Sequence, residues 1–120
     1  MVDTRTVGFE KEKEAIKFLQ KRGYKIIGTN YVTIFGEIDI IAKNKGNIVF
    51  IEVKYRKNLS GGTPQEAVTK SKRKKIIKSA VLYVKQNGLK DSNIRFDVVS
   101  INDDKFEIIE SAFFASGYFI

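Results

Sequence analysis

The chain has 120 residues and a formal net charge of +8, from 22 lysines and arginines against 14 acidic residues. This length predicts a single domain over residues 1–120, and the positive charge favours a polyanionic partner. No apolar run is long enough to cross a bilayer and no apolar signal segment is present, so we expect a cytoplasmic protein without a membrane partner. Cysteine and histidine are absent, which excludes disulfides, thiolate metal sites and mechanisms that use an imidazole base.

Hydrophobic periodicity and turn residues predict the elements in chain order. We expect a helix over 4–21 with Gly23 as its C-cap. A second helix is expected to open at Thr63 and Pro64, with Glu66 completing a capping box, and to extend to residue 86. Strands are expected at 24–31, 36–42, 48–56, 94–101 and 106–113. The order α-β-β-β-α-β-β predicts an α/β fold in which helices flank a mixed sheet.

Two acidic residues are predicted to face each other across the hairpin of the second and third strands. With a two-residue turn at Lys45 and Gly46, Asp39 lies opposite Glu52. Like charges directly opposite destabilise a strand pair by up to ~1 kcal/mol, and a divalent cation is the simplest reason to keep them there. A three-residue turn without a bulge would instead put these carboxylates on opposite faces.

Lys54 follows Glu52 by two positions, so both side chains share a strand face roughly 7 Å apart. Such a pair can hold a metal ion on one side and neutralise a phosphate or hydroxide on the other. An acidic strand residue, a short gap and then E-x-K is the spacing of the restriction-endonuclease-like (PD-D/E-x-K) active site. E-x-K alone is a frequent pattern, so a solvated sheet face with a cross-strand pair of Glu37 and Lys54 is the structural alternative.

A further carboxylate is expected near this face. Glu12 projects near the middle of the apolar stripe of the first helix, which is formed by Phe9, Ala15, Ile16 and Leu19. A lone carboxylate is costly on the core-facing side of a helix, so Glu12 is the helical acid expected to reach Asp39 and Glu52. The alternative is a partly solvated position in the first turn, favoured by the helix dipole.

The second helix carries a cluster of basic residues. Its buried stripe is expected at Ile76, Ile77, Ala80, Val81 and Val84, so most of the charges point outward, whereas the stem of Arg73 packs near the stripe. The residues expected to contact nucleic acid are Arg56 and Lys57 before the helix, and Lys70, Lys72, Arg73, Lys74, Lys75 and Lys78 within it. Phosphate contacts position a nucleic acid without reading its sequence, which favours structure-selective or nonspecific binding. A merely solvated basic face is the alternative.

Two other features are expected to be structural. Asp97 lies between Phe96 and Val98, so alternation predicts that it points out of the core, where it caps a turn or pairs near Arg95. The aromatic segment at 112–120 either covers the core or forms an exposed patch used for self-association.

The chain also resembles the uncharacterised bacterial YraN-like family of the restriction-endonuclease-like superfamily, which looks related to archaeal Holliday junction resolvases. The resemblance covers nearly the whole chain and rests mainly on two specific blocks, G-E-I-D at 36–39 and F-I-E-V-K-Y-R at 50–56. Further matches are Gly8, Glu12, Ala15, Phe18, Leu19, Gly23, Tyr24, Asn30, Lys70, Ala80 and the run 95–99.

The resemblance implies a metal-dependent nuclease on a restriction-endonuclease-like fold. Glu12, Asp39, Glu52 and Lys54 match the superfamily's catalytic set, and Asp39, Glu52 and, through water, Glu12 would hold Mg²⁺ or Mn²⁺ with the Val53 carbonyl. The metal would lower the pKa of a bound water and stabilise the transition state. Lys54 would orient the attacking hydroxide or neutralise the scissile phosphate. The implied partner is nucleic acid, and specifically DNA.

Two other functions stay open. The first is a noncatalytic nucleic-acid-binding module of the same fold, whose binding would not depend on Asp39. The second is a protein-interaction module that uses the aromatic C-terminus. Nucleases that cut paired strands often act as symmetric dimers, which favours a homodimer.

Overall fold

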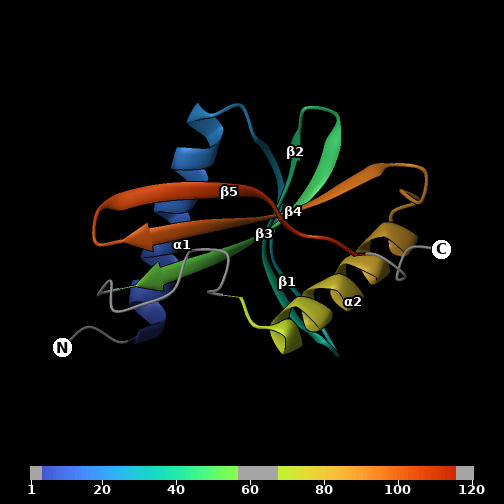
Figure 1. Cartoon of the computed structure of the whole chain (residues 1–120), viewed down its shortest axis with the longest axis horizontal. Coiled ribbons are helices and arrows are strands. Elements are labelled where there is room, and N and C mark those ends of the chain that lie inside the picture. The colour runs from blue at the N-terminus through green and yellow to red at the C-terminus, as the bar shows by residue number, and fades with distance from the viewer. Residues whose placement is uncertain (1–3, 57–67, 116–120) are drawn as a thin grey trace.

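In the part of the chain that the structure describes, residues 4–56 and 68–115, a five-stranded sheet lies between two helices. The structure is a computed structural model, and Figure 1 shows α1 behind the sheet and α2 in front of it. The elements are α1 (Thr4–Lys21), β1 (Lys25–Thr33), β2 (Gly36–Asn44), β3 (Asn47–Arg56), α2 (Lys70–Gln86), β4 (Asn93–Asn102) and β5 (Lys105–Phe113). The predicted α/β class and element order are confirmed.

The strands lie in the order β1-β2-β3-β4-β5, and β3 and β4 are the parallel pair among antiparallel neighbours. Parallel neighbours need a crossover connection, which here contains α2. Side chains of β3 alternate between the two faces: Val49 and Ile51 pack with the core beneath α1, whereas Ile48 and Phe50 pack with the core beneath α2. This alternation sends the next even-numbered residue, Glu52, toward α2.

The first helix ends where the sequence predicts. Gly23 has φ of +88°, and its N–H donates to the Gln20 carbonyl at 3.1 Å, while the Tyr24 N–H donates to the Leu19 carbonyl at 3.1 Å. These two bonds are those of a Schellman cap. They turn the chain so that Leu19 and Tyr24 enter the same core cluster, which fixes the end of α1 against the sheet.

The second helix begins later than predicted. Thr69 is its N-cap: the residue is extended, and its hydroxyl accepts a hydrogen bond from the Lys72 N–H at 3.2 Å. The prediction that the helix already includes residues 68–69 is therefore wrong. The predicted capping box of Thr63 and Glu66 lies outside the described residues. Thr69 was overlooked because lysine, and not a glutamate that completes a capping box, stands three positions after it.

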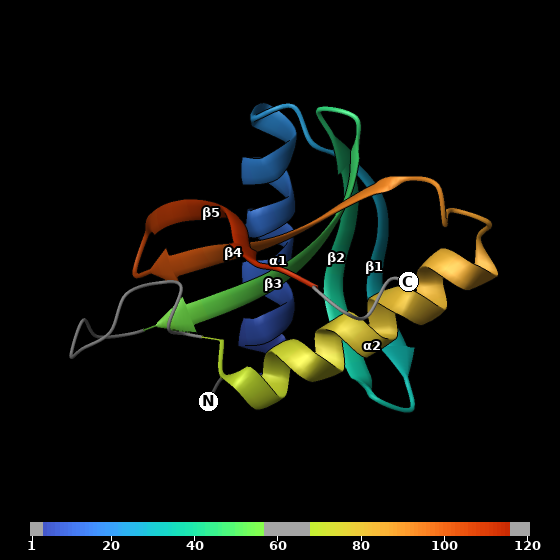
Figure 2. The same cartoon turned by 45° about the vertical axis from the view of Figure 1, so that its right-hand side comes forward.

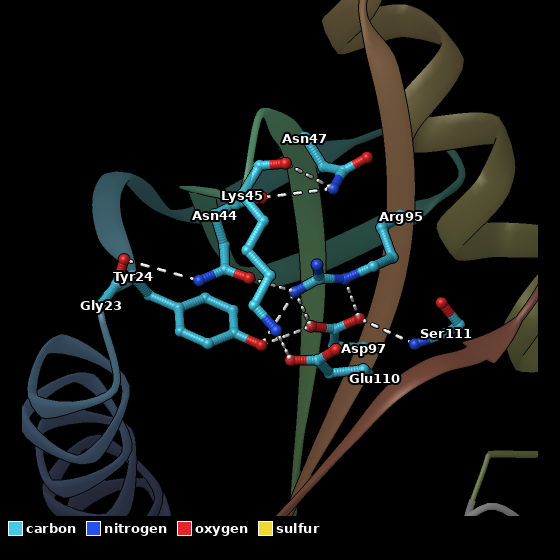
Figure 3. A network of polar contacts seen from close by, with 9 residues as sticks. All are labelled: Gly23, Tyr24, Asn44, Lys45, Asn47, Arg95, Asp97, Glu110 and Ser111. Carbon is cyan, nitrogen blue, oxygen red and sulfur yellow. Dashed lines mark hydrogen bonds and ion pairs between the residues drawn. The ribbon is translucent and has the colours of Figure 1, made fainter.

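The buried position of Asp97 contradicts the expectation that it points out of the core. Its carboxylate is fully buried, and Figure 3 shows it at the centre of a polar network. Arg95 donates to it from Nε at 2.9 Å and from Nη2 at 2.8 Å, Tyr24 donates its hydroxyl at 2.8 Å, and the Ser111 N–H donates at 3.0 Å. Alternation failed here because it assumes one solvated sheet face, whereas β4 has cover on both faces.

The network changes the proton affinity of its members. Burial, the hydrogen bond to Asp97 and the charge of Asp97 raise the pKa of Tyr24, and the bond to Asp97 raises the pKa of Arg95. Both groups therefore hold their protons more tightly than usual and remain hydrogen-bond donors to Asp97 at neutral pH.

The described part of the aromatic C-terminus divides between core and solvent. Phe113 is buried in the cluster beneath α2 and stacks on Phe96, with ring centroids 5.0 Å apart. The next residue, Phe114, is 75% exposed. Residues 116–120 lie outside the described residues, so the self-association hypothesis stays a prediction.

We expect Asp97→Ala to destabilise the fold by about 3–5 kcal/mol, because it leaves the guanidinium of Arg95, a side chain only 10% exposed, without its counter-ion. Denaturant unfolding monitored by circular dichroism would measure the free energy. The control is Lys45→Ala, which removes the exposed ion pair of Lys45 with Glu110, 3.4 Å long, and should cost less than about 1 kcal/mol. Equal losses in the two variants would contradict a structural role for the network.

Candidate functional site

The candidate site lies at a fork where β2 and β3 separate. The hairpin turn has φ of +51° at Lys45 and +79° at Gly46, and the paired residues run from Asn44 with Asn47 to Ile40 with Ile51. This is the predicted register, but the ladder stops one position before the expected pair of Asp39 and Glu52, which is not formed. The pairing ends there, and Figure 2 shows the two strands diverging beyond it, β3 toward one side and β2 toward α2.

Asp39 occupies the branching point of the fork. Its Oδ2 accepts a hydrogen bond from the Val53 N–H at 2.8 Å, so a side chain takes the place of a ladder partner. Burial, followed by the negative charge of Glu52, raises the pKa of Asp39 to about 7, although the bond from Val53 acts in the opposite direction. The two carboxylates therefore lie close enough to repel each other.

Glu52 is the most buried acid of the site, with 4% of its surface exposed. Two ammonium groups contact its Oε1: that of Lys72 at 3.3 Å and that of Lys54 at 3.8 Å. A buried carboxylate needs a cation or strong hydrogen bonds to offset the loss of hydration. Here α2 supplies one cation, and β3 supplies the other through the E-x-K spacing.

Glu12 reaches the same fork from α1. Its Oε1 accepts a hydrogen bond from the Asn30 side chain at 3.0 Å. Burial, and then the charges of Asp39 and Glu37, raise the pKa of Glu12 to about 7. The side chain is half-buried, so the structure favours the expected position beside Asp39 over a solvated first turn.

The expected cross-strand pair of Glu37 and Lys54 does not form among the described residues. Glu37 instead pairs in register with Val32 of β1 and is exposed. The physical reason is the fork: beyond Ile40 the two strands no longer lie side by side, so residues that the register would place opposite each other are drawn apart. Lys54 contacts Glu52 instead.

The basic residues of α2 fall into two groups. Lys72 and Arg73 are half-buried; Arg73 donates from Nε to the Val68 carbonyl at 2.9 Å, and its guanidinium lies over the Phe113 ring. The packed stem expected for Arg73 is confirmed. The exposed members are Lys70, Lys74, Lys75 and Lys78. Lys57 and the side chain of Arg56 lie outside the described residues.

Sequence reasoning missed two contacts. The family resemblance includes Asn30 but indicates no role for it. Lys72 is expected from the sequence to point outward and contact nucleic acid, whereas its ammonium group contacts Glu52. A signal existed for Asn30, because asparagine is disfavoured within strands but tolerates positive φ, and its φ is +50°. Its register position is level with Asp39, between the pairs Thr29–Ile40 and Tyr31–Ile38.

Hard oxygen atoms are the donors that the fork offers to a metal ion. They belong to Asp39 and Glu52, with the main chain at Val53 and the carboxylate of Glu12 beside them. Over residues 4–56 and 68–115, no three or more acidic, histidine or cysteine side chains are arranged as a metal-holding group. Over the same ranges, no helix is long and apolar enough to span a membrane.

Comparison with known proteins gives a family. The family model described as "Uncharacterised protein family UPF0102" matches residues 11–101, a range that includes Glu12, Asp39, Glu52 and Lys54. A UPF0102 protein of Lachnoclostridium phytofermentans is 43% identical over 111 residues, which are 92% of this chain and 94% of the relative. One of Thermodesulfovibrio yellowstonii is 48% identical over 108 residues, 90% of this chain and 96% of the relative. The chain therefore belongs to the UPF0102 family.

Proposed function

We propose that this protein is a metal-dependent nuclease that hydrolyses phosphodiester bonds in DNA, in a structure-selective or nonspecific manner. The observation that carries the proposal is the buried carboxylate of Glu52, which lies beside Asp39 at the fork and contacts two lysines. This combination suits a reaction that needs both a divalent cation and a polyanionic substrate. The resemblance to the restriction-endonuclease-like superfamily points in the same direction.

Asp39 and Glu52 would hold Mg²⁺ or Mn²⁺, with the Val53 carbonyl as a further ligand and Glu12 as an outer one. The donor set supports this fit, because both ions prefer oxygen ligands and Mg²⁺ keeps several waters. When bound, the ion would supply a water of lowered pKa and stabilise charge on the phosphate.

The chain's own residues would position the reacting groups. Lys54, held 3.8 Å from Glu52, would orient the attacking water or neutralise the scissile phosphate. Lys72 would neutralise a phosphate from the side of α2. Glu12, which accepts a hydrogen bond from Asn30, would hold a water of the metal ion in place. The absence of histidine is compatible with this scheme, since carboxylates, lysines and water do all the acid–base work.

The exposed basic residues of α2 would bind the substrate backbone. They lie before and after Lys72 along the helix, and they are Lys70, Lys74, Lys75 and Lys78. Contacts of this kind make affinity fall steeply with salt and give no base readout.

A noncatalytic DNA-binding module is the second candidate. The observation that favours it is that two lysines already offset the charge of Glu52 without a metal ion. The two candidates differ in metal dependence, because a binding module would keep its affinity for DNA when Asp39 is replaced.

Asp39→Asn is expected to lower the affinity for Mn²⁺ by at least ~10-fold, because it removes the charge of one of two ligands. Calorimetric titration of Mn²⁺ at pH 8 measures this without a guess at the substrate. The matched control is Glu110→Gln, which removes an exposed carboxylate paired with Lys45 and should leave the titration unchanged. Saturable Mn²⁺ binding of equal affinity in the wild type and in Asp39→Asn would contradict a metal site at Asp39.

The pKa values predict an unusual pH dependence of stability without metal. Glu12 and Asp39 have pKa values of about 7 in the fold, against ordinary values of 4.5 and 3.8. Between about pH 4 and pH 7 the folded chain therefore binds more protons at these groups than the unfolded chain does, so their contribution to stability is lost as pH rises. Thermal melts in chelator should show Asp39→Asn melting above wild type at pH 8, by about 4 °C per kcal/mol of repulsion removed. At pH 4 this advantage should vanish.

Methionine variants separate the two lysines of Glu52. Lys54→Met is expected to lower the rate of DNA cleavage by about 10²–10³-fold, because it removes a donor to the reacting phosphate, while DNA affinity changes little. Lys72→Met is expected chiefly to weaken DNA binding. Single-turnover cleavage and fluorescence anisotropy measure the two effects. If Lys72→Met abolishes cleavage while Lys54→Met does not, the assigned roles are wrong.

A further inference from the structure

The tip of the β1–β2 hairpin is apolar and exposed. Ile34 is 92% exposed and Val32 is 72% exposed, while Phe35 is half-buried beneath the ammonium group of Lys78, 5.5 Å from its ring centre. Large aliphatic side chains at such exposure gain nothing from the core. Their position at the end of a hairpin invites a contact with something outside the fold.

Polar neighbours hold the turn, so that the tip can carry apolar residues. Turns of this kind usually rely on Gly, Asn or Asp at their centre, but here Ile34 and Phe35 occupy it. The hydroxyl of Thr33 accepts from the Phe35 N–H at 3.0 Å and donates to the Gly36 carbonyl at 3.2 Å. It also bonds to the hydroxyl of Ser79 in α2 at 2.7 Å. The turn is therefore fixed to α2 through Thr33 and through the contact of Phe35 with Lys78, without help from Ile34.

Two lysines of α2 lie beside the tip. Lys78 covers Phe35, and Lys75 packs beside Gly36, where an added Cβ would lie 3.7 Å from that of Lys75. Both lysines are exposed. An apolar projection beside two lysines is complementary to a polyanion that also offers apolar surface, and the stacked bases of DNA provide such surface between their phosphates.

The tip also lies beside the fork. Lys72 contacts Glu52, and Lys75, which flanks the tip, comes three residues later on the same side of α2. The strand that leaves the tip, β2, carries Asp39 only a few residues along. Figures 1 and 2 both show the hairpin extending past α2 at the end where β2 and β3 diverge.

We propose that this hairpin tip inserts into DNA where base stacking is interrupted, at a branch, a flap junction or a duplex end. Ile34 and Val32 would cover the face of the last stacked pair, as apolar wedges do in proteins that kink DNA. This inference rests on the proposed function and specifies its substrate: a phosphate next to a break in stacking is brought to the fork.

An open groove next to the tip supports an unpaired base as part of that substrate. It has a volume of about 500 Å³ and is lined by Tyr31, Val32, Thr33, Ile34, Leu82 and Gln86. Mixed aromatic and aliphatic walls with a few polar groups suit the face and edge of an unstacked base.

A second copy of the chain fits the tip less well. The chain carries a net charge of +8, and the tip is flanked by Lys75 and Lys78. A symmetric contact between two tips would bring these ammonium groups together, whereas a nucleic acid would neutralise them.

The test compares a three-way DNA junction with a linear duplex of the same length and composition, by fluorescence anisotropy in chelator. Ile34→Asn places a favoured turn residue at the tip, and Val32→Ser is a second variant in case the turn changes. Each is expected to weaken junction binding by about 10-fold, which is about 1.4 kcal/mol, and duplex binding by less than about twofold. The slope of log affinity against log salt should not change, because no phosphate contact is lost.

Two controls frame the result. Phe114→Ser changes another exposed apolar residue, 75% exposed at the end of β5, and should leave the preference for the junction intact. Lys75→Met should weaken binding to both substrates and lower the salt slope by about one.

If these two variants lose affinity equally for junction and duplex, or lose affinity for neither, the proposed insertion of the tip into DNA (the wedge) is overturned. A shift from dimer to monomer of Ile34→Asn in analytical ultracentrifugation would assign the tip to a second copy instead. Cleavage plays no part in this readout, so the nuclease can fail by showing no metal-dependent hydrolysis while the wedge stands. Absence of wild-type binding to both DNAs would overturn the wedge and the proposed DNA partner together.

Discussion

The hydrogen bond from the Val53 N–H to the Asp39 carboxylate is the interaction on which the fork depends. When two strands separate, buried main-chain groups lose their partners, and an unsatisfied N–H costs about 1–3 kcal/mol. Asp39 supplies the missing acceptor at 2.8 Å, so β2 can turn toward α2 while β3 continues beside β4. The same bond fixes the carboxylate of Asp39 next to Glu52, which makes the site a direct result of the separation.

The two buried carboxylates of this sheet, Asp97 and Glu52, differ in how fully their charges are offset. Asp97 accepts four hydrogen bonds, two of them from Arg95, and such a satisfied group has little capacity left for a ligand. Glu52 meets two flexible lysines at 3.3 and 3.8 Å and a carboxylate that repels it. A buried pair of this kind adds little stability. The metal ion that we propose would offset the repulsion between the carboxylates of Glu52 and Asp39.

The sequence predicted the local part of this site and missed the part that needs tertiary structure. The turn at Lys45 and Gly46 gave the register that brings Asp39 toward Glu52, and the stripe of α1 gave the direction of Glu12. The end of the pairing of β2 with β3 at Ile40 and Ile51 was not predictable. The alternation of polar and apolar residues continues past this point in both strands. The contact of Lys72 with Glu52 joins α2 to β3, two elements that are separated in the sequence. No periodicity within either element encodes such a contact.

The position of α2 would let one helix take part in both the binding and the chemistry that we propose. Its buried stripe holds it against the sheet through Ile76, Ile77 and Ala80, and the bond of Ser79 to Thr33 ties it to the hairpin. Helix geometry sets the Cα atoms of Lys72 and Lys75 about one turn apart, and the two anchors hold this part of α2 at the fork and beside the tip. Under the proposed function, substrate phosphates would contact these two lysines at neighbouring positions. A rigid spacing of this kind would select DNA by its shape, even though none of these residues reads a base.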